Sequence, residues 1–567
     1  MSAPVKRKGK LLSLLLLIIL KGINPSYGFD IGETFSRSVG ITGELSSYGE
    51  LYSVAGRESR KPSSAGRVYM RTDFSLLSTF RISFSLMLTN TGSSARQEIN
   101  RISLNPKWRW GQAHLGYFTP NISNLFLRGT TVKGAGLNLY PGPLRLLVAG
   151  GETRRAVESG WDNSVYRRVL YGIKLGLGEA SGTHFDINAM YARDDSSSIS
   201  IEPPSADTTV IDSLLQFPQG EQNGVTPKEN LAMGVETQIS LFSRSLIIRG
   251  EAAASAYTRN QYAAEEKLDK TPRLITDIFK IRRSSSFDYA YTAAMDINLT
   301  SFRLSTAHTY VGPGYYSLGL PTNSNDRNAF EVSGRYRFAG GRLSLKGKFR
   351  TEHNNLIDQK VFTTAKNSYQ IGSVIRIFRG ITANLSLTWN IMTNDASDDS
   401  SKVDILVGGY SIGLNFAFRA LNLNHSASIN YTNQSTSDRN IIRRGKDVTI
   451  QNISFAGSTI LSRSFTLSPS LVIGITDSES AGRTTTANTA LNLGSTFFNG
   501  KATNNLSCGF VSSRQTGILR INEQISLFLY KAATLRLIIT HSSFNGKSKE
   551  DKDYHETTAG LNFAHRF

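Results

Sequence analysis

The chain has 567 residues, a net charge of +20, a mean hydropathy of −0.23 and 10% aromatic residues. The aromatic content argues against a disordered chain, and the single cysteine, Cys508, excludes an intramolecular disulfide and a cysteine-based metal site. The positive charges are spread along the sequence rather than gathered in blocks, so we expect no nucleic-acid partner. A pore for anions or a place beside anionic lipid remains open.

The first 28 residues have the layout of a secretory signal peptide. A basic segment precedes an apolar run from Leu11 to Leu20, and a polar stretch then ends at Gly28. The alternative is an N-terminal anchor, but the run is shorter than the about 20 residues that a spanning helix needs. We therefore expect a signal peptide over residues 1–28 and one domain over residues 29–567.

Between Ser38 and Gly178 the alternation of apolar and polar residues is weak. Gly134–Asn138 is typical of a strand, and Tyr140–Pro143 is typical of the turn that follows it. Any error in a strand count is therefore expected in this part of the chain.

The rest of the chain alternates with period two over long stretches. Apolar residues occupy every second position from Phe287 to Leu299, and again from Ile381 to Ile391. Such alternation indicates strands with one apolar and one polar face. Stretches of about 10–14 residues exceed the about 5–6 of soluble strands and suit strands that are tilted across a bilayer.

The connections between these stretches alternate in length. Short ones include Ala339–Arg342 and Phe378–Gly380, whereas Asp194–Pro227 and Arg259–Arg283 are long and polar. Short turns on one side and long loops on the other are typical of an up-and-down barrel in an outer membrane.

The C-terminal strand carries apolar side chains at Ala559, Leu561, Phe563 and Phe567, with His565 out of pattern. This ending and the architecture of the mature chain resemble those of Gram-negative outer-membrane β-barrels. The resemblance implies an all-β transmembrane antiparallel barrel, located in the outer membrane among its lipids. It also implies that Leu561, Phe563 and Phe567 form the signal read by the barrel-assembly machinery. The alternating stretches predict about 26 strands, with 22–26 allowed. The segment from Phe29 to about Arg37 is too short to be a domain, so we expect no N-terminal plug domain.

Charged residues that fall out of phase with apolar neighbours are expected to line the lumen of such a barrel. They are either an anion-favouring lining or charges that brace one another across strands. These candidates are Arg249, Glu251, Asp288, Asp296, Arg303, Arg335, Arg337, Lys346, Lys348, Arg350, Arg376, Arg520, Glu523 and Arg536.

A barrel of about 26 strands encloses a lumen wide enough to leak solutes, so something must close it. We expect either a long outer loop folded inward, with Asp194–Pro227 and Arg259–Arg283 as the candidates, or a periplasmic or lipoprotein partner as a plug. A short helix is expected within Arg259–Arg283.

The eight histidines are scattered, and neither an H-E-x-x-H nor a G-x-S-x-G motif occurs. We therefore expect no enzyme, no catalytic residue, no cofactor and no metal. The sequence favours a gated or plugged passage for solutes or a polymer. The alternatives are a barrel scaffold whose outer loops bind at the surface without conduction, and a surface hydrolase.

Overall fold

The computed structural model describes residues 39–76, 79–91, 99–159, 163–200, 225–266, 278–322, 324–443, 445–514, 516–530, 532–546 and 553–567. The proposed signal peptide lies outside the described residues and stays a prediction. So does most of Asp194–Pro227, together with residues 267–277 of the loop in which a short helix is expected.

The described chain forms one antiparallel sheet of 26 strands. The first half contains β1 (Val39–Ala55), β2 (Ser64–Leu76), β3 (Phe80–Thr89), β4 (Arg101–Trp108), β5 (Gly111–Phe118), β6 (Val132–Leu139), β7 (Leu144–Arg154), β8 (Arg168–Gly178), β9 (His184–Asp194), β10 (Glu229–Leu241), β11 (Leu246–Thr258), β12 (Ser285–Asn298) and β13 (Phe302–Val311). The second half contains β14 (Arg327–Phe338), β15 (Leu343–His353), β16 (Thr364–Phe378), β17 (Ile381–Asn394), β18 (Asp404–Ala420), β19 (Leu423–Asp438), β20 (Val448–Ser462), β21 (Phe465–Ser478), β22 (Gly482–Phe497), β23 (Ala502–Ser512), β24 (Thr516–Tyr530), β25 (Ala533–Gly546) and β26 (Tyr554–Arg566).

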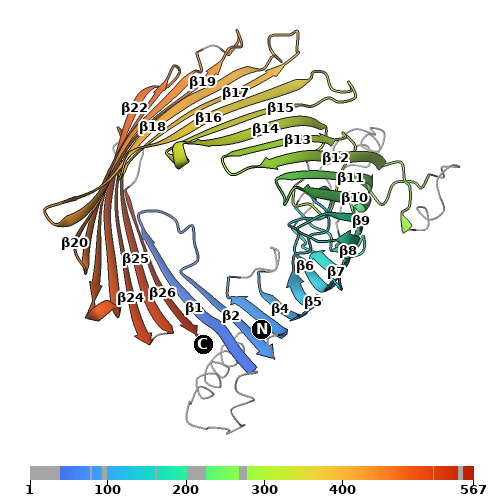
Figure 1. Ribbon diagram of the computed structural model, residues 1–567, viewed down its shortest axis with the longest axis horizontal. Coiled ribbons are helices and arrows are strands. Elements are labelled where there is room, and N and C mark those ends of the chain that lie inside the picture. Colours follow the sequence, from blue (N-terminus) through green and yellow to red (C-terminus); the bar gives the residue numbers. More distant parts are fainter. Residues whose placement is uncertain are drawn as a thin grey trace, which may run out of the picture.

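The sheet closes on itself because β1 pairs with β26, from Glu44 opposite Arg566 to Ala55 opposite His555. Each strand pairs with its neighbours in sequence, so the wall is an up-and-down barrel, as Figure 1 shows. Phe567 completes the seam, since its backbone exchanges hydrogen bonds of 2.8 and 3.1 Å with Gly43. The predicted number of about 26 strands is therefore confirmed, and the last strand closes the barrel.

Period two separates two faces along every strand. On β8, Leu170 is fully buried on the inner face, whereas its neighbour Tyr171 is 58% exposed on the outer face. Ile173, Leu175 and Leu177 continue this exposed apolar row. In lipid every backbone polar group must be paired, and a closed barrel with an apolar outer face meets that condition.

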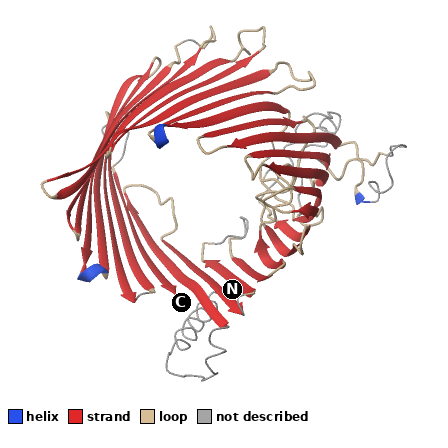
Figure 2. Ribbon diagram, viewed as in Figure 1, coloured by secondary structure: helices blue, strands red, loops and turns tan. Residues whose placement is uncertain are grey.

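The connections differ in length at the two ends of the barrel, as Figure 2 shows. The short turns include η1 (Ala339–Gly341) and η2 (Phe498–Gly500), both single turns of 3-10 helix. No helix among the described residues is long and apolar enough to cross a membrane.

The region with weak alternation has the shortest strands. β4, β5 and β6 have eight residues each, whereas β18 and β19, outside this region, have 17 and 16. Pro106 lies within β4, and Gly116 of β5 has a φ of 88°, so the ladder between these two strands is interrupted. These irregularities account for the weak sequence signal.

Candidate functional site

Most of the predicted lumen charges share the inner face of the barrel. Arg249 and Glu251 lie on β11, Asp288 and Asp296 on β12, and Arg303 on β13. The remaining ones on this face are Arg335 and Arg337 (β14), Lys346, Lys348 and Arg350 (β15), Arg376 (β16), Arg520 (β24) and Arg536 (β25).

Glu523 does not share that face, so its expected place on the lumen wall is wrong. The register sets Glu523 opposite Leu506 and Ile539, in the apolar row that also contains Ile521. The physical reason is parity, because Glu523 lies three residues after Arg520 and successive side chains point to opposite faces of a strand.

Part of the inner face braces itself with opposite charges. On β14 and β15, Glu331 accepts from Lys348 at 2.9 Å and from Arg350 at 3.1 Å, and Arg350 also reaches Glu352 at 2.8 Å. Arg249 pairs with Asp296 between β11 and β12. These pairs agree with the bracing alternative for this part of the wall.

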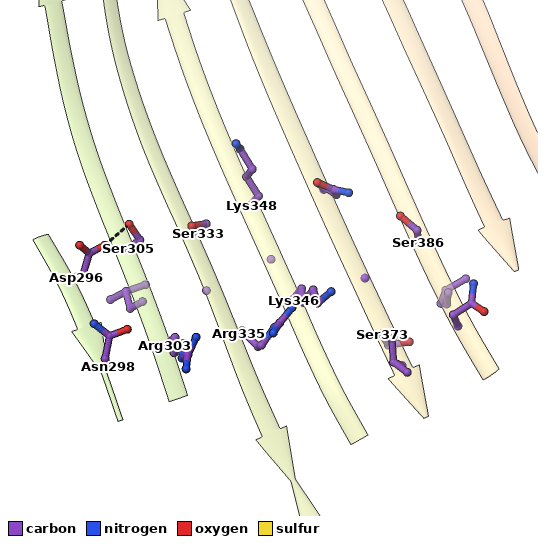
Figure 3. Close-up of a pocket in the computed structure, with 18 residues that line it drawn as sticks. Asp296, Asn298, Arg303, Ser305, Ser333, Arg335, Lys346, Lys348, Ser373 and Ser386 are labelled. Carbon is purple, nitrogen blue, oxygen red and sulfur yellow. Dashed lines mark hydrogen bonds between the residues drawn. The ribbon is translucent and has the colours of Figure 1, made fainter. Parts of the chain in front are cut away.

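Nearer the short turns, three cations have no such partner. Arg303 lies directly opposite Arg335, and Arg335 lies directly opposite Lys346. Among the described residues, no carboxylate forms an ion pair with any of these three, which we call the cation row. They line a groove of about 480 Å³ on the inner wall, shown in Figure 3.

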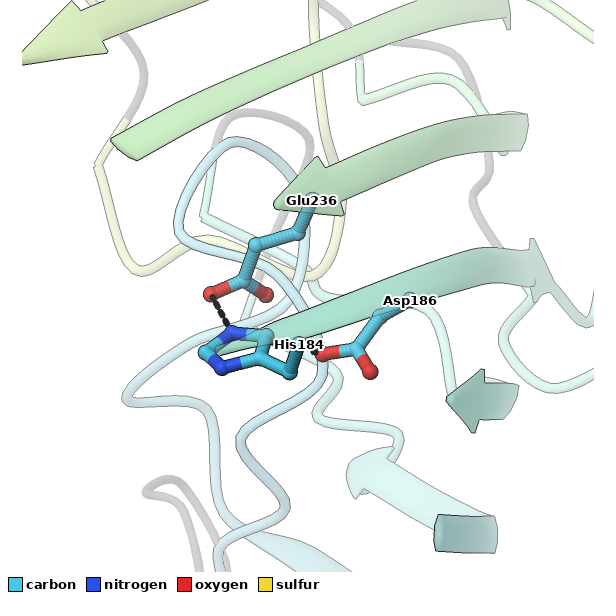
Figure 4. A group of neighbouring side chains, drawn as sticks. All are labelled: His184, Asp186 and Glu236. Atoms are coloured by element: carbon cyan, nitrogen blue, oxygen red, sulfur yellow. Dashed lines mark ion pairs between the residues drawn. The ribbon is translucent and has the colours of Figure 1, made fainter. Parts of the chain in front are cut away.

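A second charged cluster lies near the short turns of β7 to β10. His184, Asp186 and Glu236 offer ligand atoms within 4.8 Å of one another. Figure 4 draws these three side chains together. Lys174 already occupies the space between the carboxylates, at 3.4 Å from Asp186 and 2.8 Å from Glu236, and Arg145 pairs with Asp186. The two acids and two bases cancel, so this cluster braces the wall and lacks the net negative charge that attracts a cation.

One connection folds inward against the wall. Residues 119–131, between β5 and β6, carry Ile122, Phe126 and Leu127, all fully buried. They pack with Leu170, Met190 and Ala232 from the inner faces of β8, β9 and β10. Burial of each such side chain contributes about 1.5–3 kcal/mol, so the contact is strong enough to hold this loop in place.

Glu251 of β11 anchors the same loop through its carboxylate. Ser123 donates to it at 2.5 Å, the side-chain amide of Asn124 at 2.9 Å and the backbone N–H of Leu125 at 3.3 Å. Hydrogen bonds to a charged group contribute about 1.5–3 kcal/mol each. A predicted lumen charge therefore holds a loop in place.

A second inward connection, residues 312–322 and 324–326 between β13 and β14, packs on the first. Tyr315 and Ser317 donate hydrogen bonds to the carbonyls of Leu125 and Phe126, at 3.1 and 2.6 Å. Leu127 forms a parallel bridge with Gly319. We call residues 119–131, 312–322 and 324–326 the inner loop pair. Loops gather on the inner side of this part of the wall in Figures 1 and 2.

The wall also holds the second loop directly. Asn230 of β10 accepts from the backbone N–H of Leu318 at 3.1 Å, and Ser255 of β11 donates to the carbonyl of Tyr316 at 2.5 Å. Asp288 of β12 accepts from the backbone N–H of Gly314 at 2.9 Å. Asp288, like Glu251, therefore holds an inward loop.

The loop Arg259–Arg283 does not fold inward in its described part, so the expectation that it occludes the lumen is wrong there. Phe279 is fully buried against Leu231, Ala256 and Tyr191, which belong to the outer face. Its ring also lies 6.2 Å from that of Phe287, another outer residue. Phe279 buries its apolar ring against the apolar outer face, which is more favourable than exposing that ring in a polar lumen.

Sequence reasoning missed the residues that receive the inner loops. A Cβ at Gly172 of β8 would lie 2.6 Å from Ile122 Cδ1 and 2.9 Å from Leu127 Cδ2. A Cβ at Gly234 of β10 would lie 3.1 Å from Phe126 Cε1. Inward glycines on otherwise well-formed strands were the available signal, because glycine in a strand interior often marks a close approach.

No protein-family model and no curated protein matches the sequence. Among solved structures, the P pilus usher (PapC) translocation pore is 11% identical, with a TM-score of 0.35 and coverage of 93% of this chain and 99% of that one. The ferric enterobactin receptor PfeA is 9% identical, with a TM-score of 0.42 and coverage of 93% and 81%. OccAB4 of Acinetobacter baumannii is 11% identical, with a TM-score of 0.31 and coverage of 68% and 99%.

These similarities concern the barrel fold alone, so we draw function from the geometry of this chain. A closed antiparallel barrel of 26 strands with an apolar outer face is an outer-membrane β-barrel, and its location in the outer membrane follows from that fold.

Proposed function

We propose that this barrel is a passage for hydrophilic solutes across the outer membrane, narrowed by the inner loop pair. The observation that supports it most is the contrast between the two faces of the wall. The inner face carries Arg303, Lys346, Lys348 and other charges that water must solvate, whereas the outer face is apolar.

The inner loop pair supports narrowing of this passage. It is attached to the wall of β8 to β13 by buried side chains and by hydrogen bonds to Glu251, Asn230 and Asp288. A loop fixed by that many contacts is a permanent part of the lumen, so the pore is narrower than its strand count implies.

Conductance of purified protein in planar lipid bilayers tests the proposal. We expect stepwise currents that are smaller than an unobstructed barrel of this strand number would pass. A fully inserted barrel that carries no ionic current at either polarity of the applied voltage would overturn the proposed passage. It would favour a scaffold whose outer loops bind at the surface.

A further inference from the structure

The cation row sets three inner-wall cations directly opposite one another, and no carboxylate among the described residues forms an ion pair with them. We propose that Arg303, Arg335 and Lys346 form a binding site for a multivalent anion rich in phosphate groups. This inference rests on the proposed passage only for the route by which such a solute reaches the site.

Register makes the row unfavourable on its own. Directly opposite residues of antiparallel strands have Cβ atoms about 4.5–5.5 Å apart, and like charges in such pairs destabilise the sheet. Here two such pairs share Arg335, because Arg303 and Lys346 are its partners on either side. Three adjacent strands each place a cation in this line, and a bound anion would supply the negative charge that balances them.

The surroundings contain no carboxylate that could supply it. Residues 297–305, 333–347 and 371–385 include no Asp or Glu. The last two of these segments contribute further cations, Arg337 and Arg342 in one and Arg376 and Arg379 in the other. Asp296, at the edge of the groove, is already engaged by Arg249 and by Ser305 at 2.6 Å.

The same two strands show what compensation looks like one step further along. There Glu331 satisfies both Lys348 and Arg350. β14 and β15 therefore form ion pairs across their inner face in the middle of the wall, but no ion pair of this kind involves the cation row. This contrast separates a site for a ligand from an ordinary charged lining.

The chemistry of the groove suits phosphate. Two guanidinium groups can each donate paired hydrogen bonds to a phosphate group, and an ammonium group adds a compact charge. Uncharged donors flank the row, since Asn298 lies opposite Arg303 and Ser333 lies opposite Lys348. Figure 3 shows these side chains distributed over adjacent strands along one wall. An extended chain of several phosphates matches a row better than a single small anion does.

Isothermal titration calorimetry tests the site. The full chain, in detergent and at low ionic strength, is titrated with inorganic tripolyphosphate. We expect saturable binding that Arg335→Gln weakens about tenfold or more, and Arg303→Gln similarly. Arg520→Gln, which removes one inner charge from β24, should change the affinity less than twofold. Citrate as a second titrant separates phosphate preference from a general preference for multivalent anions.

The unfolding temperature of Arg335→Gln without ligand separates a binding site from a bracing role. A site predicts a rise in this temperature, whereas a bracing role predicts a fall. Without tripolyphosphate, Arg335→Gln should unfold at a higher temperature than the unmodified protein, because a repulsion is removed. With tripolyphosphate, the unmodified protein and Arg335→Lys should gain stability and Arg335→Gln should gain little.

The outcomes are decisive for the site separately from the passage. Absence of saturable binding, an equal loss in Arg520→Gln, or a lower unfolding temperature of unliganded Arg335→Gln would each overturn the site. Binding by a barrel that carries no current would leave the site standing and remove the passage, whereas current without binding would do the reverse.

Discussion

Replacement of Phe126 with alanine should release the first inner loop from the barrel wall. The ring is fully buried among inner-face residues of β8 to β11, and a Cβ at Gly234 would already touch it. Truncation of a buried phenylalanine costs about 3–5 kcal/mol. Since about 1.4 kcal/mol is a factor of ten, the ratio of docked to undocked loop should fall by a factor of about 100 to a few thousand.

Hydrogen exchange and bilayer conductance measure this release in two independent ways. The backbone N–H of Leu127 bonds to the carbonyl of Ser123 at 3.0 Å within the docked loop, so its exchange should accelerate strongly in Phe126→Ala. The single-channel current should rise or flicker to larger levels, because a detached loop no longer narrows the lumen at a fixed position.

The matched control is Phe510→Ala, which removes the same ring from the exposed outer face of β23. It should leave both the exchange of residues 119–131 and the current unchanged. If Phe126→Ala behaves like this control in both assays, the loop is not held by the contacts described, and the reasoning on its docking fails.

Four further changes have defined expectations. Gly172→Leu should displace Ile122 and Leu127 while the strand pairing stays intact, and protease should then cut residues 119–131 faster than in the unmodified barrel; equal cutting rates would contradict the close fit. Glu251→Gln keeps the shape but removes the charge that three donors share, so we expect about 2–5 kcal/mol weaker docking by hydrogen exchange and no change in the barrel spectrum. Burial raises the pKa of Asp326, but hydrogen bonds from the Lys360 ammonium and two backbone amides outweigh it and leave the pKa below its ordinary value. The stability that this carboxylate contributes is therefore present above about pH 4 and is lost as pH falls further. The protection of residues 354–363 against hydrogen exchange, relative to an unfolded chain, should fall in acid, and in Asp326→Asn it should not depend on pH. Truncation of Phe567 removes two backbone bonds to Gly43 at the seam, and the yield of heat-modifiable barrel on gels should drop, whereas an unchanged yield would contradict its role in closure.

The wall was predictable because its signal is local. Alternation from Phe287 to Leu299 needs only a polar and an apolar side of a strand, and β12 spans most of that stretch. The strand number followed from the same pattern together with the alternation of short and long connections. Where Pro106 and Gly116 interrupt the ladder, the pattern weakened and the strands are short.

The inward loops were not predictable from length. Arg259–Arg283 was the more obvious candidate, yet Phe279 packs on the outer face, and the shorter residues 119–131 enter the lumen instead. The choice depends on contacts between positions more than 100 residues apart, such as Ser123 and Glu251. A single sequence does not reveal these pairings.

The charges of the lumen needed both parity and register. Parity alone separates Arg520 from Glu523, which the sequence interpretation did not apply strictly enough. Register decides whether Arg335 faces an acid or another base, and hairpin geometry fixes it only once the turn residues are known. The cation row therefore became visible only in the structure.

Thiol labelling along one strand tests the central claim, a closed wall that is wet inside and lipid-facing outside. In a Cys508→Ser background, single cysteines are placed at consecutive positions from Ser344 to Arg350 of β15 and treated, after reconstitution, with a charged thiol reagent. Reaction should occur at Ser344, Lys346, Lys348 and Arg350 and be blocked at the residues between them. Uniform labelling, or reaction at the intervening positions alone, would contradict the barrel and the passage together.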